Sequence, residues 1–218
     1  MIKERPLILI GDSAFAEIAY EYFTHDSTFE VVGFAVERAF KQKHTLFGVP
    51  VVAFEELEER FAPDTHSFFA ALVYTEGNAL RERLYQAAKA KGYTPASYVS
   101  PRAFVWPNVE IGEHCFIFEH NTVQPFVKLG DNVILWSGNH IGHHSRIGSH
   151  TFVSSHCVIS GFVSIGTHAF LGVNSTLTNN LMVGDRVLIG AGALVVGDVA
   201  DDAHVVGLWR RRKEDDRR

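Results

Sequence analysis

The sequence contains 12 histidines, a residue suited to proton chemistry, and two of them, His143 and His144, are adjacent. An imidazole has an ordinary pKa of about 6.5 and can therefore accept a proton at neutral pH, as a general base must. Gly161 follows His143 by 18 residues. A glycine leaves its backbone N–H open to approach, so it can donate a hydrogen bond to a carbonyl oxygen that becomes negatively charged. A base and such a donor, held together, suit acyl transfer.

A six-residue repeat is the element that would bring these two residues together. Every sixth residue from Val99 to Val195 is Val, Ile or Leu, over 17 positions without an insertion, and the next step, Asp201, ends the run. An aliphatic residue followed by glycine also recurs every 18 residues from Ile111 to Gly184. Three hexads therefore form a larger unit, which predicts a triangular solenoid whose coils stack at about 4.8 Å. An amphipathic helix would need a period of about 3.6 residues instead.

The predicted coil has a second inward position, four residues after each large aliphatic residue. It is usually small or β-branched, and Asn121, Asn139 and Leu181 depart from this pattern. The two cysteines, Cys115 and Cys157, fall on this position. Their separation of 42 residues is two coils and one hexad, so they should lie on different faces and form no disulfide. Histidine and cysteine show no zinc-ligand spacing, and we expect no metal.

Residues 1–96 have a different pattern, which predicts a small α/β domain with a parallel, Rossmann-like sheet. Apolar runs predict strands, and helices are expected between them. The expected strands are 6–10, 30–35, 48–51 and 68–73, and the expected helices are 14–23 and 78–92. The predicted domains are thus 1–96, a β-helix at 97–200, and a charged C-terminal tail at 201–218.

Composition limits the classes of partner. The net charge is −5 and the isoelectric point is near 6.2, which argues against a nucleic-acid-binding protein. No apolar run approaches the roughly 18 residues of a membrane-spanning helix, and the charged N-terminus with its short apolar run is unlike a secretory signal. These features predict a cytoplasmic globular protein without membrane insertion.

The hexapeptide pattern resembles the left-handed parallel β-helix of the acyltransferase superfamily. With an α/β domain in front, nearly the whole chain is similar to the PglD/NeuD family of sugar acyltransferases. The resemblance implies that the N-terminal domain binds a nucleotide-linked sugar and that acetyl-CoA lies between two subunits of a homotrimer. It also implies that the histidine of an H-[DE]-x-x-I-G motif is the general base. The matching segment is HHSRIG at 143–148, which makes His143 the candidate base and the Gly161 amide the oxyanion donor.

His144 stands where that family has an acidic residue. A carboxylate there would orient the base, and a second histidine cannot supply the same fixed charge. His144 is nevertheless a candidate catalytic residue, and Asn139 or His140 could hold His143 instead. Alternatively, proton transfer is less assisted, or the acceptor differs.

The remaining candidates bind the two substrates. The pantetheine arm of acetyl-CoA is expected along one ladder of corner residues: Gly161, Phe162, Gly172, Val173, Asn174, Gly190 and Ala191. The nucleotide sugar is expected to contact Gly11, Ser13, Glu37, Asn78, Arg81 and His140. Gly11 and Ser13 lie in a glycine-poor turn that could offer N–H groups to phosphate. Each of these residues also has a structural explanation, as a turn, a helix cap or a solvated charge.

The sequence thus predicts an acetyl-CoA-dependent N-acetyltransferase that acts on the amino group of a nucleotide-linked deoxysugar, for surface polysaccharide or glycan synthesis. One alternative is O-acetylation of a sugar such as sialic acid. A second alternative is a non-catalytic β-helix that serves as an assembly or sugar-binding module.

Overall fold

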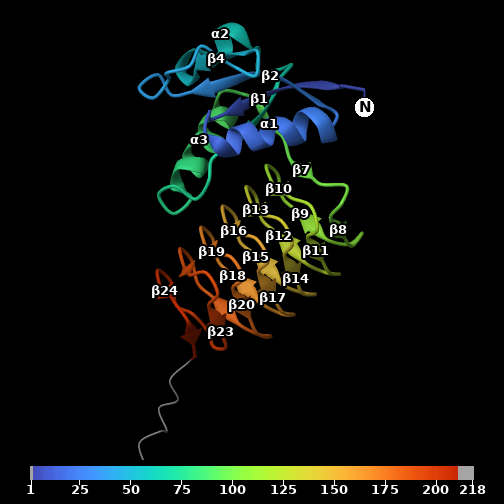
Figure 1. Cartoon of the computed structure of the whole chain (residues 1–218), viewed down its shortest axis with the longest axis vertical. Helices are drawn as coiled ribbons and strands as arrows, with labels where there is room; N and C mark the ends of the chain where they lie inside the picture. The colour runs from blue at the N-terminus through green and yellow to red at the C-terminus, as the bar shows by residue number, and fades with distance from the viewer. Residues whose placement is uncertain (1, 211–218) are drawn as a thin grey trace, which may run out of the picture. The chain divides into compact units, whose positions relative to one another are not determined.

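The computed structural model describes residues 2–210, and its contacts divide the chain into two compact units between Tyr98 and Val99 (Figure 1). Each unit has its own hydrophobic core. The first is an α/β unit and the second is a β-helix. Among the described residues, no helix is both long and apolar enough to cross a membrane.

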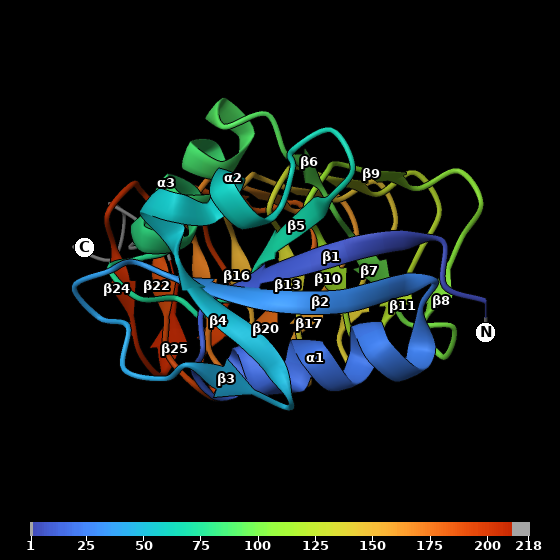
Figure 2. The same ribbon diagram turned by 90° about the horizontal axis from the view of Figure 1, so that it is seen from above.

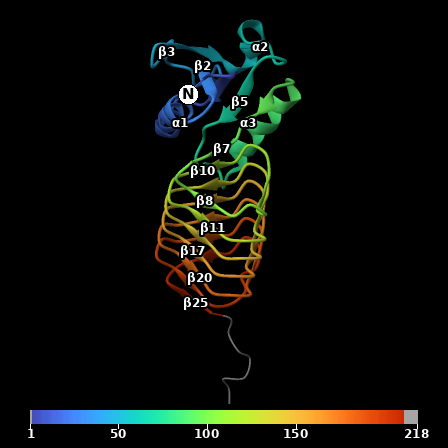
Figure 3. The ribbon, with the colours of Figure 1, turned by 90° about the vertical axis from the view of Figure 1, so that its right-hand side faces the viewer.

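The α/β unit is built on one six-stranded sheet with the order β3-β4-β2-β1-β5-β6. All neighbouring strands are parallel except β3 and β4, which form an antiparallel edge. Figures 2 and 3 show α1 and α3 on opposite faces of this sheet. The elements are β1 (Arg5–Ile10), α1 (Ala14–Asp26), β2 (Phe29–Val36), β3 (Thr45–Leu46), β4 (Val49–Ala53), a short 3-10 helix (Phe54–Glu56), α2 (Leu57–Arg60), β5 (Ser67–Ala70), α3 (Ala79–Ala90) and β6 (Thr94–Pro95).

Both faces of the central strand β1 are buried, as expected of a parallel sheet covered by helices on both sides. Ile8 and Ile10 belong to the cluster that includes Tyr85 of α3. Leu7 and Leu9 alternate with them and are equally buried. The strands and helices predicted for 1–96 are confirmed, with ends shifted by a few residues. The short elements β3, α2 and β6 were not predicted.

The β-helix consists of three parallel sheets, and its coils follow one another along the chain (Figure 3). The first sheet contains β7 (Tyr98–Val99), β10 (Phe116–Ile117), β13 (Ile134–Leu135), β16 (Phe152–Val153), β19 (Phe170–Leu171), β22 (Leu188–Ile189) and β24 (His204–Val205). The second contains β8 (Phe104–Val105), β11 (Thr122–Val123), β14 (His140–Ile141), β17 (Val158–Ile159), β20 (Thr176–Leu177), β23 (Leu194–Val195) and β25 (Leu208–Trp209). The third contains β9 (Glu110–Ile111), β12 (Lys128–Leu129), β15 (Arg146–Ile147), β18 (Ser164–Ile165) and β21 (Met182–Val183). The prediction of a β-helix is confirmed.

The second residue of each strand points into the prism, so the hexad aliphatic residues form its core. Val99 is the exception: on the first rung, it is 40% exposed. Two predicted departures, Asn121 and Asn139, are buried inside and have hydrogen-bond partners. Asn139 donates to the Trp136 carbonyl at 2.6 Å and accepts from the Cys157 N–H at 2.7 Å. Hydrogen bonding therefore explains how the core accommodates asparagine.

The solenoid continues past Asp201, which corrects the predicted boundary at residue 200. Leu188 pairs with His204, and Leu194 pairs with Leu208, at shorter intervals than in the preceding coils. Shortened corners break the six-residue register without ending strand pairing, so the sequence pattern stops before the fold does. Of the predicted charged tail, residues 211–218 lie outside the described residues.

Both cysteines are buried in the β-helix and free, as predicted. Burial raises the pKa of the Cys157 thiol, although a hydrogen bond from Ser175 opposes the shift. A buried thiol with a raised pKa is a poor nucleophile.

Candidate functional site

Three corners separate the sheets of the β-helix. We call the corner between the first and second sheets corner 1, the corner between the second and third sheets corner 2, and the remaining one corner 3. His143 follows β14 and Gly161 follows β17, so both lie on corner 2 in successive coils. A Cβ atom at Gly161 would stand 2.8 Å from Cε1 and 2.9 Å from Nε2 of His143. The imidazole therefore lies directly on this glycine, and the predicted juxtaposition is present.

The Gly161 N–H is open at this corner. Its neighbours are engaged, because the Ser160 N–H donates to the Leu177 carbonyl and the Phe162 N–H donates to the His143 carbonyl. Over residues 2–210, the Gly161 N–H itself makes no hydrogen bond. An open N–H beside an imidazole is the arrangement that a base and an oxyanion donor require.

Gly142 keeps that N–H accessible. A Cβ atom at residue 142 would stand 2.5 Å from the Gly161 nitrogen, so any larger residue would collide with the next coil. The sequence analysis did not single out Gly142. Its position one residue before the candidate base, together with the 18-residue repeat, could have identified it.

His144 is the ring partner of His143. The two Nδ1 atoms are 3.1 Å apart, which places them within hydrogen-bond distance. The His144 ring stacks between two phenylalanines, with centroid distances of 4.6 Å to Phe126 and 4.8 Å to Phe162. Gln124 accepts the backbone N–H of His143 at 2.9 Å. Phe126 and Gln124 were missed from the sequence, although Phe126 precedes His144 by one 18-residue repeat.

The expectation that Asn139 or His140 holds His143 is wrong. Asn139 is inside the prism and uses its amide on Trp136 and Cys157. His140 is the outward residue of β14, between Thr122 and Val158 of the neighbouring strands, and has no hydrogen bond to His143 in the described part of the chain. Alternation along the strand separates these residues from corner 2.

The acetyl-CoA candidates do not follow one corner, which corrects the expected ladder. Gly161 and Phe162 are on corner 2 with His143, whereas the others follow β19 and β22 and therefore lie on corner 1. The residues on corner 1 are Gly172, Val173, Asn174, Gly190 and Ala191. Gly172 is 11 residues from Gly161, which is not a whole coil. Asn174 has φ +58°, so the left-handed corner alone accounts for its asparagine.

The α/β unit brings several predicted residues to one edge of its sheet. Gly11 and Glu37 follow the carboxyl ends of β1 and β2, where ligands of such sheets bind. The Gly11 N–H is used within the sheet, because it donates to the Ala35 carbonyl at 2.8 Å. Ser13 precedes α1 without a side-chain capping bond. Lys43, which the sequence analysis missed, reaches this turn and donates to the Asp12 carbonyl at 2.8 Å.

Three candidates in this unit, with Glu37 again among them, are paired with or buried against other parts of the protein. Glu37 forms a two-pronged ion pair with Arg83, at 2.8 and 2.9 Å, and this guanidinium lowers the pKa of the Glu37 carboxyl. Arg81 is fully buried, with Nη1 at 3.4 Å from each of the Leu72 and Val73 carbonyls. Asn78 is buried at the start of α3 with φ +73°. The burial of Arg81 and Asn78 therefore supports a structural role for both residues.

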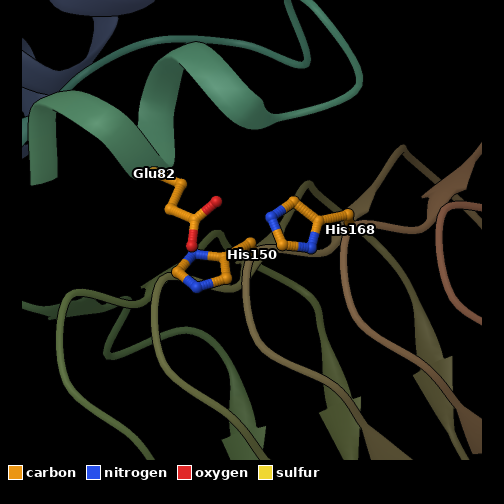
Figure 4. A group of neighbouring side chains, drawn as sticks. All are labelled: Glu82, His150 and His168. Carbon is orange, nitrogen blue, oxygen red and sulfur yellow. The ribbon is translucent and has the colours of Figure 1, made fainter. Parts of the chain in front are cut away.

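Corner 3 carries a column of polar residues that was not predicted, although its members recur every 18 residues. Asn132 joins His114 and His150, with 2.9 Å to the Nδ1 atom of each. Figure 4 shows His150 and His168 on successive coils. Their ring centroids are 4.8 Å apart. The 18-residue repeat places His114, His150 and His168 on one corner. Hydrogen bonds through Asn132 account for how His114, Asn132 and His150 are held together. The expectation that the protein needs no metal stays a prediction.

Comparison with known proteins agrees with this architecture. The profile of the bacterial transferase hexapeptide family, with six repeats, matches residues 126–161, which include corner 2 at His143 and Gly161. The matched segment lies within the six-residue repeat of the β-helix. No protein of curated function matches the sequence.

Several solved structures share both units. The acetyltransferase domain of PglB from Neisseria gonorrhoeae FA1090 in complex with acetyl coenzyme A is 23% identical, with a TM-score of 0.82 over 92% of this chain and 95% of that chain. PerB from Caulobacter crescentus, in complex with CoA and GDP-perosamine, is 25% identical, with a TM-score of 0.78 over 92% of this chain and 93% of that one. WeeI from Acinetobacter baumannii AYE is 21% identical, with a TM-score of 0.67 over 94% and 97% of the two chains. The resemblance to sugar acyltransferases, and with it the acyltransferase class, is confirmed.

Proposed function

We propose that this chain is a cytoplasmic, acetyl-CoA-dependent N-acetyltransferase that acts on the amino group of a nucleotide-linked deoxysugar. The observation that carries the proposal is the imidazole of His143 lying on Gly161, whose N–H is open. PerB, which shares both units, is a protein whose structure holds CoA and GDP-perosamine, an amino sugar joined to a nucleotide. An amine that loses a proton and a CoA thioester that forms an oxyanion are the reactants that a base and an oxyanion donor on one corner would serve.

His143 acts as the general base in this proposal. Its Nδ1 faces His144, while its Nε2 has no hydrogen bond within residues 2–210. As the sugar amine attacks the thioester carbonyl carbon, Nε2 takes the proton that the nitrogen loses. The carbonyl oxygen becomes an oxyanion and accepts a hydrogen bond from the Gly161 N–H. The C–S bond then breaks, the amide remains on the sugar, and the CoA thiolate takes the proton back from His143.

The α/β unit is proposed to hold the nucleotide. Its parallel strands end at Gly11 and Glu37, and the N-terminus of α1 follows Gly11 and Ser13. The remaining free N–H groups of a first helical turn attract phosphate oxygens, and the Lys43 ammonium adds a positive charge beside the turn. Each Glu37 oxygen accepts one hydrogen bond from Arg83 and keeps a second lone pair, which is proposed to accept a hydrogen bond from a ribose hydroxyl.

A homotrimer is part of the proposal, because the acetyl-CoA candidates occupy two corners of one prism. Gly161 on corner 2 and Gly172 on corner 1 can line one groove only if corner 1 of a neighbouring copy faces corner 2. Sedimentation of the full chain measures this assembly, with a trimer expected and a monomer contradicting it.

An amine is favoured over a hydroxyl as acceptor. A neutral amine is already nucleophilic before it loses a proton, whereas a hydroxyl depends on the base to remove its proton as it attacks, and the partner of His143 is an imidazole instead of a carboxylate. Matched pairs of nucleotide-linked sugars, with an amino group or a hydroxyl at the same carbon, should be offered with acetyl-CoA while thiol release is followed. Amino sugars should be acetylated. Release with the hydroxyl partners alone would favour O-acetylation, and calorimetry that detects no saturable binding of acetyl-CoA would favour a non-catalytic module.

A further inference from the structure

His144 lies in an aromatic clamp beside the proposed base. We propose that His144 is a positioning residue: its Nδ1 lone pair accepts the Nδ1–H of His143 and so leaves the Nε2 lone pair of His143 free to take the proton. This inference rests on the proposed function, since it assigns the orienting role within the same site. It explains how the corner can work without the acidic residue that the resemblance led us to expect.

The contact between the two rings permits only two arrangements of one proton. The Nδ1 atoms are 3.1 Å apart, so one of them donates and the other accepts. If His143 donates, its Nε2 carries a lone pair and can act as a base. If His144 donates, His143 must carry its own proton on Nε2 and cannot accept another there. Productive chemistry therefore requires His144 as the acceptor, with its proton on Nε2.

The clamp fixes the direction of the accepting lone pair. Phe126 and Phe162 stack on the two faces of His144, with interplanar angles of 28° and 15°. Phe162 also meets the edge of His143 at 88°. The rings leave His144 little freedom to rotate, so its Nδ1 stays directed at His143. Fixed orientation of the partner is the contribution that an orienting group makes to a catalytic histidine.

The other partners of the two histidines carry no charge. Over the described residues, the hydrogen-bonding and ring partners of the two histidines are Phe126, Phe162 and Gln124, and none of them titrates. Gly161, beneath His143, is also uncharged. The next charged side chain along the chain, Arg146, is exposed on β15. A first proton gives the imidazolium of His143 with a neutral acceptor. A second proton would leave an N–H on both Nδ1 atoms, so the hydrogen bond between the two rings would be lost.

A neutral acceptor stabilises the His143 imidazolium less than a carboxylate does. A variant with an acid at residue 144 should therefore keep the proton on His143 up to a higher pH than the wild-type chain does. The acid limb of kcat/KM reports the protonation of the base in the free enzyme. Replacing His144 by aspartate should accordingly move the acid limb to higher pH.

Three substitutions distinguish the contribution of the acceptor atom at residue 144 from the contribution of its stacked ring. Corner 2 already carries phenylalanine and asparagine in the required left-handed conformation, with φ of +66° at Phe126, +60° at Phe162 and +60° at Asn180. His144→Phe keeps the stacked ring and removes the acceptor. His144→Asn keeps an acceptor oxygen and removes the ring. His144→Asp supplies the charge.

The kinetic experiment measures kcat, the KM for acetyl-CoA and the pH dependence of kcat/KM for these variants, with His204→Ala as a control for the loss of an exposed imidazole. His144→Phe should lower kcat about 10- to 100-fold with little change in KM. His144→Asn should recover most of that loss, and His144→Asp should shift the acid limb upward by about one pH unit. Wild-type turnover in His144→Phe would overturn the proposal.

Imidazole nitrogen NMR at pH 8 tests the same inference without turnover. The wild-type chain should show His143 protonated on Nδ1 and His144 protonated on Nε2, with signals assigned from the single variants. The opposite pair of tautomers would overturn the inference even if the enzyme is active. If no acyl transfer is found, the proposed function fails, and the tautomers alone decide whether His144 positions its neighbour.

Discussion

In the β-helix, side chains meet partners one coil away, whereas in the α/β unit they meet partners at irregular separations. His143 lies on Gly161 and Asn132 bonds to His150, and both pairs are separated by 18 residues. In the α/β unit, Glu37 pairs with Arg83 and Tyr98 with Asp26. A repeating unit thus converts one sequence interval into a contact many times over. A sheet covered by helices has no such rule, so its contacts must be observed.

The chain also separates the two units spectroscopically. All three tryptophans, Trp106, Trp136 and Trp209, belong to the β-helix, and all six tyrosines fall within residues 1–98. Tryptophan fluorescence therefore reports on the β-helix and tyrosine absorbance on the α/β unit.

Removing the base should produce the largest change. We expect His143→Ala to lower kcat by about 100- to 10,000-fold, the range for loss of general base catalysis. Acetyl-CoA binding should persist, because the backbone of corner 2 is unchanged. Thiol release and calorimetry measure the two properties, with His204→Ala as the control. Near wild-type turnover would mean that another group is the base.

Removing the buried side-chain amide of Asn139 should weaken the β-helix. Asn139→Val offers a residue that hexads at the other two corners carry at the inward position, but it leaves the Cys157 N–H and the Trp136 carbonyl without this side chain. The expected cost is about 2 kcal/mol of unfolding free energy, since buried polar groups lose their partner. Urea unfolding followed by tryptophan fluorescence measures it. An unchanged midpoint would show that valine packing compensates.

Tyr93 should make the α/β unit sensitive to alkali. Burial raises the pKa of its hydroxyl to about 12, and the hydroxyl donates to the Phe61 carbonyl. A raised folded-state pKa contributes stability that is complete below the ordinary tyrosine pKa of about 10 and is lost as pH rises toward 12. Tyr93→Phe should therefore cost about 1 kcal/mol at pH 8 and progressively less above pH 10.

Absorbance at 295 nm during alkaline titration shows the same group directly. The wild-type chain should show an ionisation step near pH 12 from Tyr93, and Tyr93→Phe should lack that step. Persistence of that step in the variant would assign the shift to another tyrosine.

The ion pair at the edge of the α/β sheet should have the smallest effect. Arg83 lowers the pKa of Glu37, so their pairing stabilises the folded state above the ordinary glutamate pKa of about 4.3 and is lost as pH falls below it. Because the guanidinium is 55% exposed, Arg83→Met should cost only about 0.5 kcal/mol at pH 7. Tyrosine-monitored unfolding at pH 7 and at pH 3 measures the difference, and equal costs at both would contradict the assignment to charge.

The difference between the β-helix and the α/β unit explains which contacts could be predicted from the sequence. The aliphatic hexads determined the prism, and the 18-residue interval brought His143 onto Gly161, because backbone pairing enforces the register. Phe126, His144 and Phe162 are spaced by the same interval, but the clamp around His144 was not predicted, because side-chain orientation at a corner does not follow from spacing. The Gly11 N–H was expected to be open, yet a neighbouring strand uses it. Arg81 was expected to face a phosphate, yet it is buried beside main-chain carbonyls.

The most direct test of the account is a crystal structure of the full chain with a stable ketone analogue of acetyl-CoA and a nucleotide-linked amino sugar. The account predicts the analogue carbonyl oxygen at about 3 Å from the Gly161 nitrogen, and the sugar nitrogen at a similar distance from Nε2 of His143. A carbonyl bound at corner 1 or corner 3, or an amine out of reach of His143, would contradict the central claim that corner 2 carries the reaction.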